Sequence, residues 1–200
     1  KREALMAAGK DPYGHAFAYS HHLADLAEQY ADLEDGASTE DEVKVAGRVM
    51  AKRDQGKLAF LELRDSTGDM QLFCRINALG EDAFAELKDL DVGDWIGVEG
   101  TMMRTKRGQL SVSVASFELL SKSLRPLPEK FHGLADKETR YRQRYVDLIV
   151  NDDVRDTFIK RSKIISAFRH YMENDGYYEV ETPIPVSYTH LRAHETAANL

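Results

Sequence analysis

Residues 43–75 read VKVAGRVMAKRDQGKLAFLELRDSTGDMQLFCR. In 43–49, valine or glycine at every second position alternates with charged or small residues, the period of two that is typical of a half-buried strand. A turn then leads to an apolar segment at 58–63, and Ser-Thr-Gly-Asp leads to another at 70–75. The segment therefore predicts three consecutive strands joined by short turns.

The sequence that follows predicts a helix and two further strands. Apolar residues recur at helical spacing in 79–90, and Asp91–Asp94 ends that pattern. Strands are expected at 95–103 and 110–117, on either side of a turn at Lys106–Gly108. Three strands, a helix and two strands are the order of the five-stranded Greek-key barrel known as the OB-fold, which binds oligonucleotides.

Helical patterns lie on both sides of the barrel segment. A stiff linker is expected at Leu124–Pro128, because each proline fixes its own φ and restricts the residue before it. The other elements expected outside the barrel are short helices at 1–8 and 21–30, a helix at 141–149, a long helix at 152–176 and a strand from Tyr177 to Pro183.

The charges are unevenly distributed along the chain. With 27 lysines and arginines against 34 acids, the net charge is −7, which by itself argues mildly against nucleic-acid binding. Many of the acids gather in 28–42, however, while basic residues cluster at Lys52–Arg53, at Lys57 and in Arg104–Arg107. A local basic face can bind phosphate although the whole chain is acidic.

A single cysteine, Cys74, excludes an internal disulfide and fits a reducing cytoplasm. We expect it to be a small buried residue on a strand. No apolar run approaches the roughly 18 residues that a membrane-spanning helix needs, and the N-terminus has no signal-peptide pattern. The expected location is therefore the cytoplasm, without membrane association.

The second and third strands carry candidate contacts for single-stranded bases. On this fold bases cross the face of strands two and three and stack on aromatic side chains, and Phe60 and Phe73 lie on those strands. Gln71 has both a donor and an acceptor for a base edge, and Arg53 ends strand one, where it could hold a phosphate. Phe60 and Phe73 could equally belong to the barrel core, so the pattern alone leaves both interpretations open.

Two segments beyond the barrel carry a family resemblance. Residues 123–134 read SLRPLPEKFHGL and 140–149 read RYRQRYVDLI. Both resemble the linker and first catalytic-domain helix of bacterial-type class II lysyl-tRNA synthetases. Asp11–Tyr13 and Val45–Arg48 are also similar to that family, and Gly176–Pro183 resembles class II motif 1. The resemblance covers residues 1 to about 184.

The resemblance implies a division of the chain. The barrel would be followed by the first helices and strand of a class II α+β catalytic domain, so the expected fold class is mainly β plus α. The implied domains are a helical extension at 1–40, an anticodon-binding OB-fold at 41–121, a linker at 122–139, the start of the catalytic domain at 140–184 and an unrelated tail at 185–200.

The resemblance also implies which residues contact RNA. The family's anticodon-reading positions fall on Arg53, Phe60 and Gln71, three of the residues already selected from the strand pattern. Phe73 completes the aromatic pair. Gln109 stands where the family often has glutamate, in the turn before the fifth strand, and keeps an acceptor oxygen without the charge. The implied partner is the anticodon loop of tRNA(Lys).

Motif 1 implies a homodimer in the full-length family. Its interface residues would be Phe158, Ile165, Phe168 and Pro183. The full-length family uses ATP and Mg²⁺ to form lysyl-adenylate before it transfers lysine to tRNA. The motif 2 and motif 3 arginines that hold the ATP phosphates do not occur in these 200 residues. We therefore expect no catalytic residue, no bound cofactor and no lysine activation by this segment alone.

The last sixteen residues, 185–200, match no part of that family, and we interpret them as foreign sequence. His190 and His194 have the spacing of two metal ligands on a helix, with Glu195 beside them. The glutamate is not placed as in a zincin helix, so no metal site is expected.

Two other interpretations remain open at this stage. An aspartyl- or asparaginyl-tRNA synthetase fragment would share the barrel and motif 1, but residues 125–133 favour the lysine enzyme. A non-catalytic nucleic-acid-binding module would share only the barrel and would have no need of the motif 1 helix.

Overall fold

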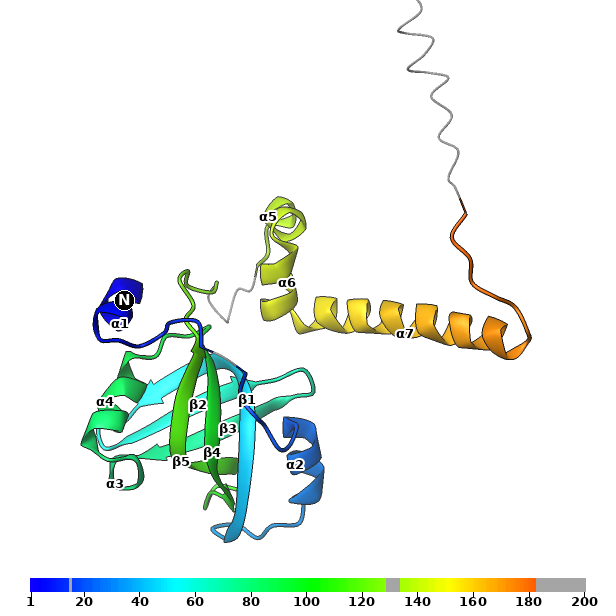
Figure 1. Cartoon of the computed structure of the whole chain (residues 1–200). Helices are drawn as coiled ribbons and strands as arrows, with labels where there is room; N and C mark the ends of the chain where they lie inside the picture. Colours follow the sequence, from blue (N-terminus) through cyan, green and yellow to red (C-terminus); the bar gives the residue numbers. More distant parts are fainter. Residues whose placement is uncertain (15, 129–133, 183–200) are drawn as a thin grey trace, which may run out of the picture. The chain divides into compact units, whose positions relative to one another are not determined.

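The computed structural model describes residues 1–14, 16–128 and 134–182. The chain divides into two compact units, Lys1–Glu129 and Lys130–Leu200. The first unit contains the barrel, and the second contains helices of the predicted catalytic-domain segment (Figure 1).

The first unit is the five-stranded closed barrel that the sequence predicts. Its neighbours follow the order β1-β2-β3-β5-β4, and only the β3–β5 pair is parallel. β1 is longer than expected because it pairs with β4 along its first part and with β2 along its last part. The strands are β1 Ser38–Asp54, β2 Leu58–Arg64, β3 Asp69–Arg75, β4 Trp95–Arg104 and β5 Leu110–Ser121.

Alternation along the strands fills the barrel interior. In β2, the side chains of Ala59, Leu61 and Leu63 are buried, and the residues between them face outward. Gly100 allows β4 to approach β5 closely, since a Cβ there would lie 2.2 Å from the carbonyl oxygen of Ser113. The predicted buried thiol is confirmed: Cys74 is fully buried, and burial raises its pKa to about 12.

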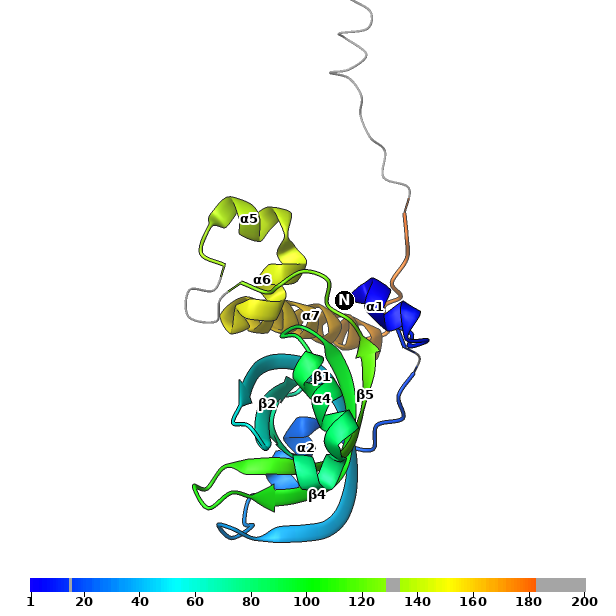
Figure 2. The same ribbon diagram turned by 90° about the vertical axis from the view of Figure 1, so that its left-hand side faces the viewer.

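Helices close the barrel on opposite sides (Figure 2). α2, Leu23–Gln29, buries Leu23 and Leu26 in the core, and α4, Glu81–Asp89, buries Phe84 and Leu87 there. The single helix predicted at 79–90 is wrong at its start, because α3, Ile76–Leu79, precedes a break at Gly80. Gly80 has a φ of +85°, which interrupts the helix. A short helix α1, Arg2–Ala7, precedes these elements.

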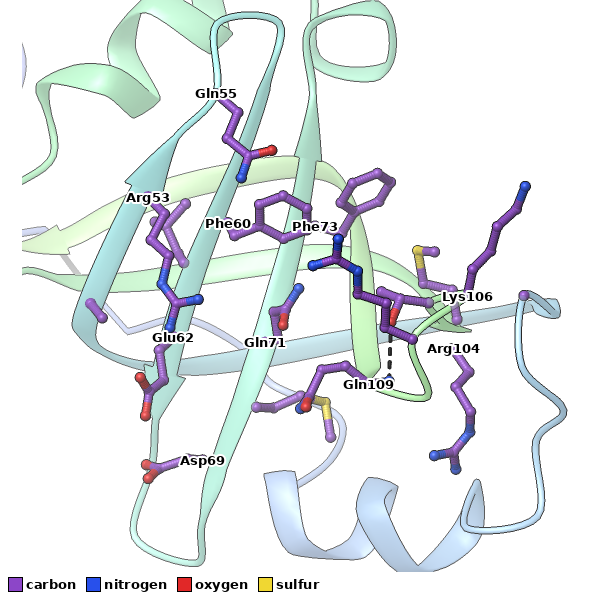
Figure 3. A pocket seen from close by; sticks show the side chains of 17 residues that line it. Arg53, Gln55, Phe60, Glu62, Asp69, Gln71, Phe73, Arg104, Lys106 and Gln109 are labelled. Atoms are coloured by element: carbon purple, nitrogen blue, oxygen red, sulfur yellow. Dashed lines mark hydrogen bonds between the residues drawn. The ribbon is translucent and has the colours of Figure 1, made fainter.

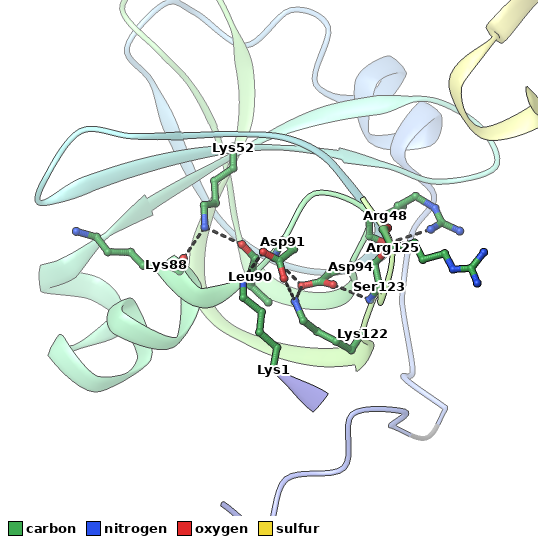
Figure 4. A network of polar contacts seen from close by, with 11 residues as sticks. Lys1, Arg48, Lys52, Lys88, Leu90, Asp91, Asp94, Lys122, Ser123 and Arg125 are labelled. Carbon is green, nitrogen blue, oxygen red and sulfur yellow. Dashed lines mark hydrogen bonds and ion pairs between the residues drawn. The ribbon is translucent and has the colours of Figure 1, made fainter. Parts of the chain in front are cut away.

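A buried ion pair fixes the point where the chain leaves the barrel (Figure 4). Asp94 accepts hydrogen bonds from Lys122 Nζ at 2.6 Å and from the Ser123 backbone N–H at 2.8 Å. The Asp94 side chain is 0% exposed and that of Lys122 is 4% exposed. Lys122 also pairs with Asp91 at 2.6 Å. The end of β5 is thereby held against the turn before β4.

The second unit contains α5 Lys137–Arg142, α6 Arg144–Val150 and α7 Asp152–Asn174. Asp147 on α6 is fully buried and accepts hydrogen bonds from Arg140 Nε at 3.0 Å and Asn151 Nδ2 at 2.6 Å. Arg144 is a further partner of the same carboxylate. One acid therefore joins the two short helices and the start of α7.

The prediction of a strand from Tyr177 is wrong for residues 177–182. Within the described part of the chain these residues form no strand. A strand is stable only when a neighbour accepts and donates its backbone hydrogen bonds, and the described part of this unit is helical. Pro183, with the whole segment 185–200 and its histidines, lies outside the described residues. Among those described, no helix combines the length and apolarity needed to cross a membrane.

Replacing Asp94 should destabilise the barrel. We expect Asp94→Asn to lower the free energy of unfolding by about 3 kcal/mol, because Lys122 would keep a buried charge without its buried partner. Urea unfolding followed by Trp95, the sole tryptophan, measures this directly. The control Lys44→Gln removes an exposed ion pair with Glu99 and should leave the free energy of unfolding almost unchanged. A similar small effect for Asp94→Asn would contradict the structural role.

Candidate nucleic-acid interface

The register of β2 against β3 places three cross-strand pairs on the outer face of the barrel. Phe60 lies opposite Phe73, Glu62 opposite Gln71, and Arg64 opposite Asp69. The residues between them, such as Leu61 and Leu72, are buried inside. The interpretation of Phe60 and Phe73 as core residues is therefore wrong, because the core is filled by their neighbours on each strand.

Phe60 and Phe73 form an accessible aromatic pair. Their ring centroids are 5.3 Å apart with the planes tilted by 36°, and both side chains are half-buried. The Arg75 guanidinium lies 5.5 Å from the Phe73 ring centre. Half-exposed rings on a strand face can stack nucleic-acid bases without sequence preference, because every base has a π-face.

All five predicted contact residues line one groove of about 920 Å³: Arg53, Phe60, Gln71, Phe73 and Gln109 (Figure 3). Arg53 on β1 lies opposite Phe60, so an arginine and two phenylalanines follow one another across three strands. Gln109 comes from the β4–β5 hairpin. Its backbone N–H donates to Thr105 Oγ1 at 3.0 Å, and its carbonyl accepts from the Thr105 N–H at 2.9 Å. The hairpin thus presents the exposed Gln109 side chain from a fixed turn.

Two of the basic residues assigned to the phosphate-binding face have structural roles instead. Lys52 Nζ donates to the carbonyls of Lys88 at 2.6 Å and Leu90 at 2.7 Å, at the end of α4. Burial lowers the pKa of Lys52. This part of the prediction was wrong because the acceptors are backbone carbonyls about forty residues away, which the sequence does not reveal.

Arg104 likewise holds the hairpin to the segment after α2. Its Nη1 donates to the Gly108 carbonyl at 2.9 Å, and its Nη2 donates to the carbonyls of Ala31 at 2.7 Å and Tyr30 at 3.1 Å. Lys106 and Arg107 on the same hairpin are exposed and line the groove with Arg53. Lys106 and Arg107 lie at the hairpin edge of the groove, and Arg53 lies on β1 beside Glu62 (Figure 3). Lys57 is exposed in the β1–β2 turn.

The groove also contains acids that the sequence did not single out. Glu62 and Asp69 line it on β2 and β3, beyond the phenylalanine pair. Asp69 is paired with Arg64, whose Nη2 donates to it at 2.7 Å. The alternation that selected Phe60 also places Glu62 on the same face two residues later, so this signal was present in the sequence. The groove therefore contains acidic as well as basic side chains.

Three of the four predicted motif 1 residues, all except Pro183, lie on α7. Phe158 is 41% and Phe168 is 64% exposed, and Ile165 is half-buried. The Arg144 guanidinium lies 5.4 Å from the Phe158 ring centre. The apolar stripe is thus present and accessible in this unit, and its role as a dimer interface stays a prediction.

Two family models match the chain. Residues 43–120 match the OB-fold nucleic acid binding domain, and residues 136–197 match the class II tRNA synthetases (D, K and N). The second match extends into 185–197, part of the segment for which we expected no relationship to that family.

Several curated relatives are lysine–tRNA ligases. The chain is 51% identical to the lysine–tRNA ligase of Synechococcus sp. (strain RCC307), over 92% of this chain and 37% of the relative. It is 50% identical to that of Clostridium perfringens (strain ATCC 13124), over 92% and 36% respectively. For Thermosynechococcus vestitus the identity is 51%, over 92% and 37%. The chain spans a little more than a third of the length of these relatives.

The aromatic pair should account for much of the affinity for single-stranded RNA. We expect Phe60→Ala and Phe73→Ala each to weaken binding of a fluorescent oligouridine by about 1–3 kcal/mol, the usual contribution of one stacked base. Fluorescence anisotropy with the whole chain measures this loss. Tyr13→Ala is the matched control, since Tyr13 is exposed and does not line the groove. Equal affinities for all the proteins would rule out the stacking role.

Proposed function

We propose that this chain, a lysine–tRNA ligase homologue over 92% of its length, binds the anticodon loop of tRNA(Lys) in the groove of its barrel. The observation that supports this most is the convergence of Arg53, Phe60, Gln71, Phe73 and Gln109 on that groove. The match of residues 43–120 to a nucleic-acid-binding OB-fold supports the same role for the barrel.

The groove suits a loop whose bases point away from its backbone. Loop bases can be splayed out and stacked on aromatic side chains, whereas bases within an RNA helix are not accessible in this way. A base stacked on Phe60 and Phe73 would present its edge to Gln71. Phosphates on either side would lie near Arg53, Lys106 and Arg107, where cations favour them.

We propose that the whole protein ligates lysine to tRNA(Lys) with the use of ATP and Mg²⁺. We also propose that it is located in the cytoplasm. The described residues contain no group of three or more histidine, cysteine, aspartate or glutamate side chains suited to a metal. We therefore assign none of them to Mg²⁺ or ATP and derive no chemical step from them. The contribution proposed for this segment is the positioning of tRNA.

We also propose that α7 forms a homodimer contact in the whole protein. Phe158, Ile165 and Phe168 give the helix an accessible apolar stripe, and a two-fold interface would bury the same stripe from each subunit. The proposed domains are 1–40, 41–121, 122–139 and 140–184, with the tail 185–200 treated as separate.

Anticodon binding predicts a preference among stem-loops. The chain should bind a stem-loop with the anticodon UUU at least tenfold more tightly than an equal stem-loop with an unrelated anticodon. The reason is that the groove residues contact base edges, and anticodons differ in the size of their bases and in the donors and acceptors on those edges. Anisotropy titrations at a fixed salt concentration measure both affinities. Equal binding would instead identify a general single-strand binding module.

The basic residues at the hairpin edge of the groove predict a dependence on salt. Lys106→Gln and Arg107→Gln should each weaken binding to every loop and reduce the slope of log affinity against log salt by about 0.7. Lys44→Gln makes the same charge change at an exposed position away from the groove and should leave the slope unchanged. A flat salt dependence of the unmodified chain would mean that these cations do not contact phosphate.

A further inference from the structure

We propose that Glu62 determines which base the groove accepts, by taking a hydrogen bond from the N3–H of a uridine held beside Gln71. The inference rests on the proposed binding of RNA in this groove and adds a residue that gives it base specificity. It follows from the register of the strands, from the hydrogen-bonding capacity of the two side chains and from the charge of the surrounding groove.

The register places Glu62 and Gln71 side by side on the groove face (Figure 3). Directly opposite residues of an antiparallel pair have Cβ atoms about 5 Å apart, so the two side chains can reach one base edge together. Their neighbour on β1 is Ala51, whose small side chain leaves space above the pair. The pair lies two residues along the strands from Phe60 and Phe73, a distance of about 7 Å.

This spacing lets one base contact both pairs. When its ring stacks on the phenylalanine pair, its edge would point along the strands toward Glu62 and Gln71. The Glu62 carboxylate disfavours phosphate next to it, whereas the charge of Asp69 is balanced by its ion pair with Arg64. Lys106 and Arg107 come from the β4–β5 hairpin, away from Glu62, and favour phosphate there, so the backbone is directed to the hairpin and base edges toward Glu62.

Gln71 alone cannot distinguish uridine from cytidine. Uridine presents the O4 acceptor beside the N3–H donor, while cytidine presents the N4 amino donor beside the N3 acceptor. A glutamine amide offers both a donor and an acceptor, so it can turn over and satisfy either O4 or N4.

An ionised glutamate has only acceptors, and it therefore lacks this freedom. Next to Gln71, the Glu62 carboxylate would accept the N3–H of uridine. With cytidine the same carboxylate would face the N3 lone pair, and neither group could donate. The pair of side chains thus favours uridine. The discrimination depends on Glu62, because its carboxylate cannot exchange an acceptor for a donor.

The test uses the whole chain and three variants of the UUU stem-loop, each with one anticodon uridine changed to cytidine. The unmodified chain should lose about tenfold or more in affinity at one of the three positions. In Glu62→Gln that loss should fall below about threefold, because the new amide can turn over as Gln71 does. N3-methyluridine at the same position should weaken binding to the unmodified chain, since it lacks the donor.

Glu118→Gln is the matched control. It removes one negative charge from an exposed position on β5 that does not line the groove, so it should keep the full preference for uridine. A tenfold loss that persists in Glu62→Gln would overturn the proposal, since Glu62 would then be only a surface charge of the strand. An equal loss of preference in Glu118→Gln would overturn it too, because a general charge effect would explain both variants.

Uridine and cytidine hexamers separate this proposal from the anticodon assignment. If the unmodified chain prefers the uridine hexamer and Glu62→Gln does not, the role of Glu62 holds. It holds even when the UUU stem-loop and a stem-loop with an unrelated anticodon bind equally. If the lysine stem-loop is preferred but oligouridine and oligocytidine bind equally, and every single cytidine replacement is tolerated, Glu62 has no such role.

Discussion

The register of β2 against β3 is the constraint on which the groove depends. A shift by one residue would move Phe60 and Phe73 into the core and bring leucines to the surface. The turn between the strands helps to fix the register: Asp65 accepts from the Gly68 N–H at 2.9 Å and from the Leu23 N–H, at the start of α2, also at 2.9 Å. Burial would raise the pKa of Asp65, but these hydrogen bonds outweigh it and hold the pKa below its usual value. The carboxylate that orders the turn therefore also attaches a helix to the barrel.

Local patterns predicted the strands well, because a period of two and the turns between segments are both visible in a short window. They predicted less where a remote group decides the outcome. Lys52 and Arg104 looked like phosphate ligands until the structure showed carbonyl partners from α4 and from the segment after α2. The expected strand after Gly176 needs a neighbour that the described residues do not contain, and alternation along a strand does not reveal this requirement.

The net charge of −7 coexists with exposed cations in the groove because many of the acids lie in 28–42 and do not line it. The acidic segment before β1 packs beside the β4–β5 hairpin: the Gly36 N–H donates to the Arg104 carbonyl at 3.0 Å, and a Cβ on Gly36 would lie 3.7 Å from Lys106 Cγ. The acids thus border the cations of the hairpin on one side. Such a border confines attraction for phosphate to the groove, whereas an evenly basic surface would bind RNA anywhere.

Burial separates the polar residues that maintain the barrel from those available to a ligand. Asp94, Lys122 and Lys52 are engaged by backbone groups or by each other, so their replacement would affect stability first. Phe60 and Gln71 lie on the outer face, where the core does not need their side chains. Phenylalanine at such a position buries less apolar surface than it would inside the barrel, so it contributes less to stability than a core phenylalanine. The proposed stacking of a base would account for its presence, and the arrangement of arginine, phenylalanine pair and glutamine across three strands fits a single-stranded nucleic acid better than an apolar partner.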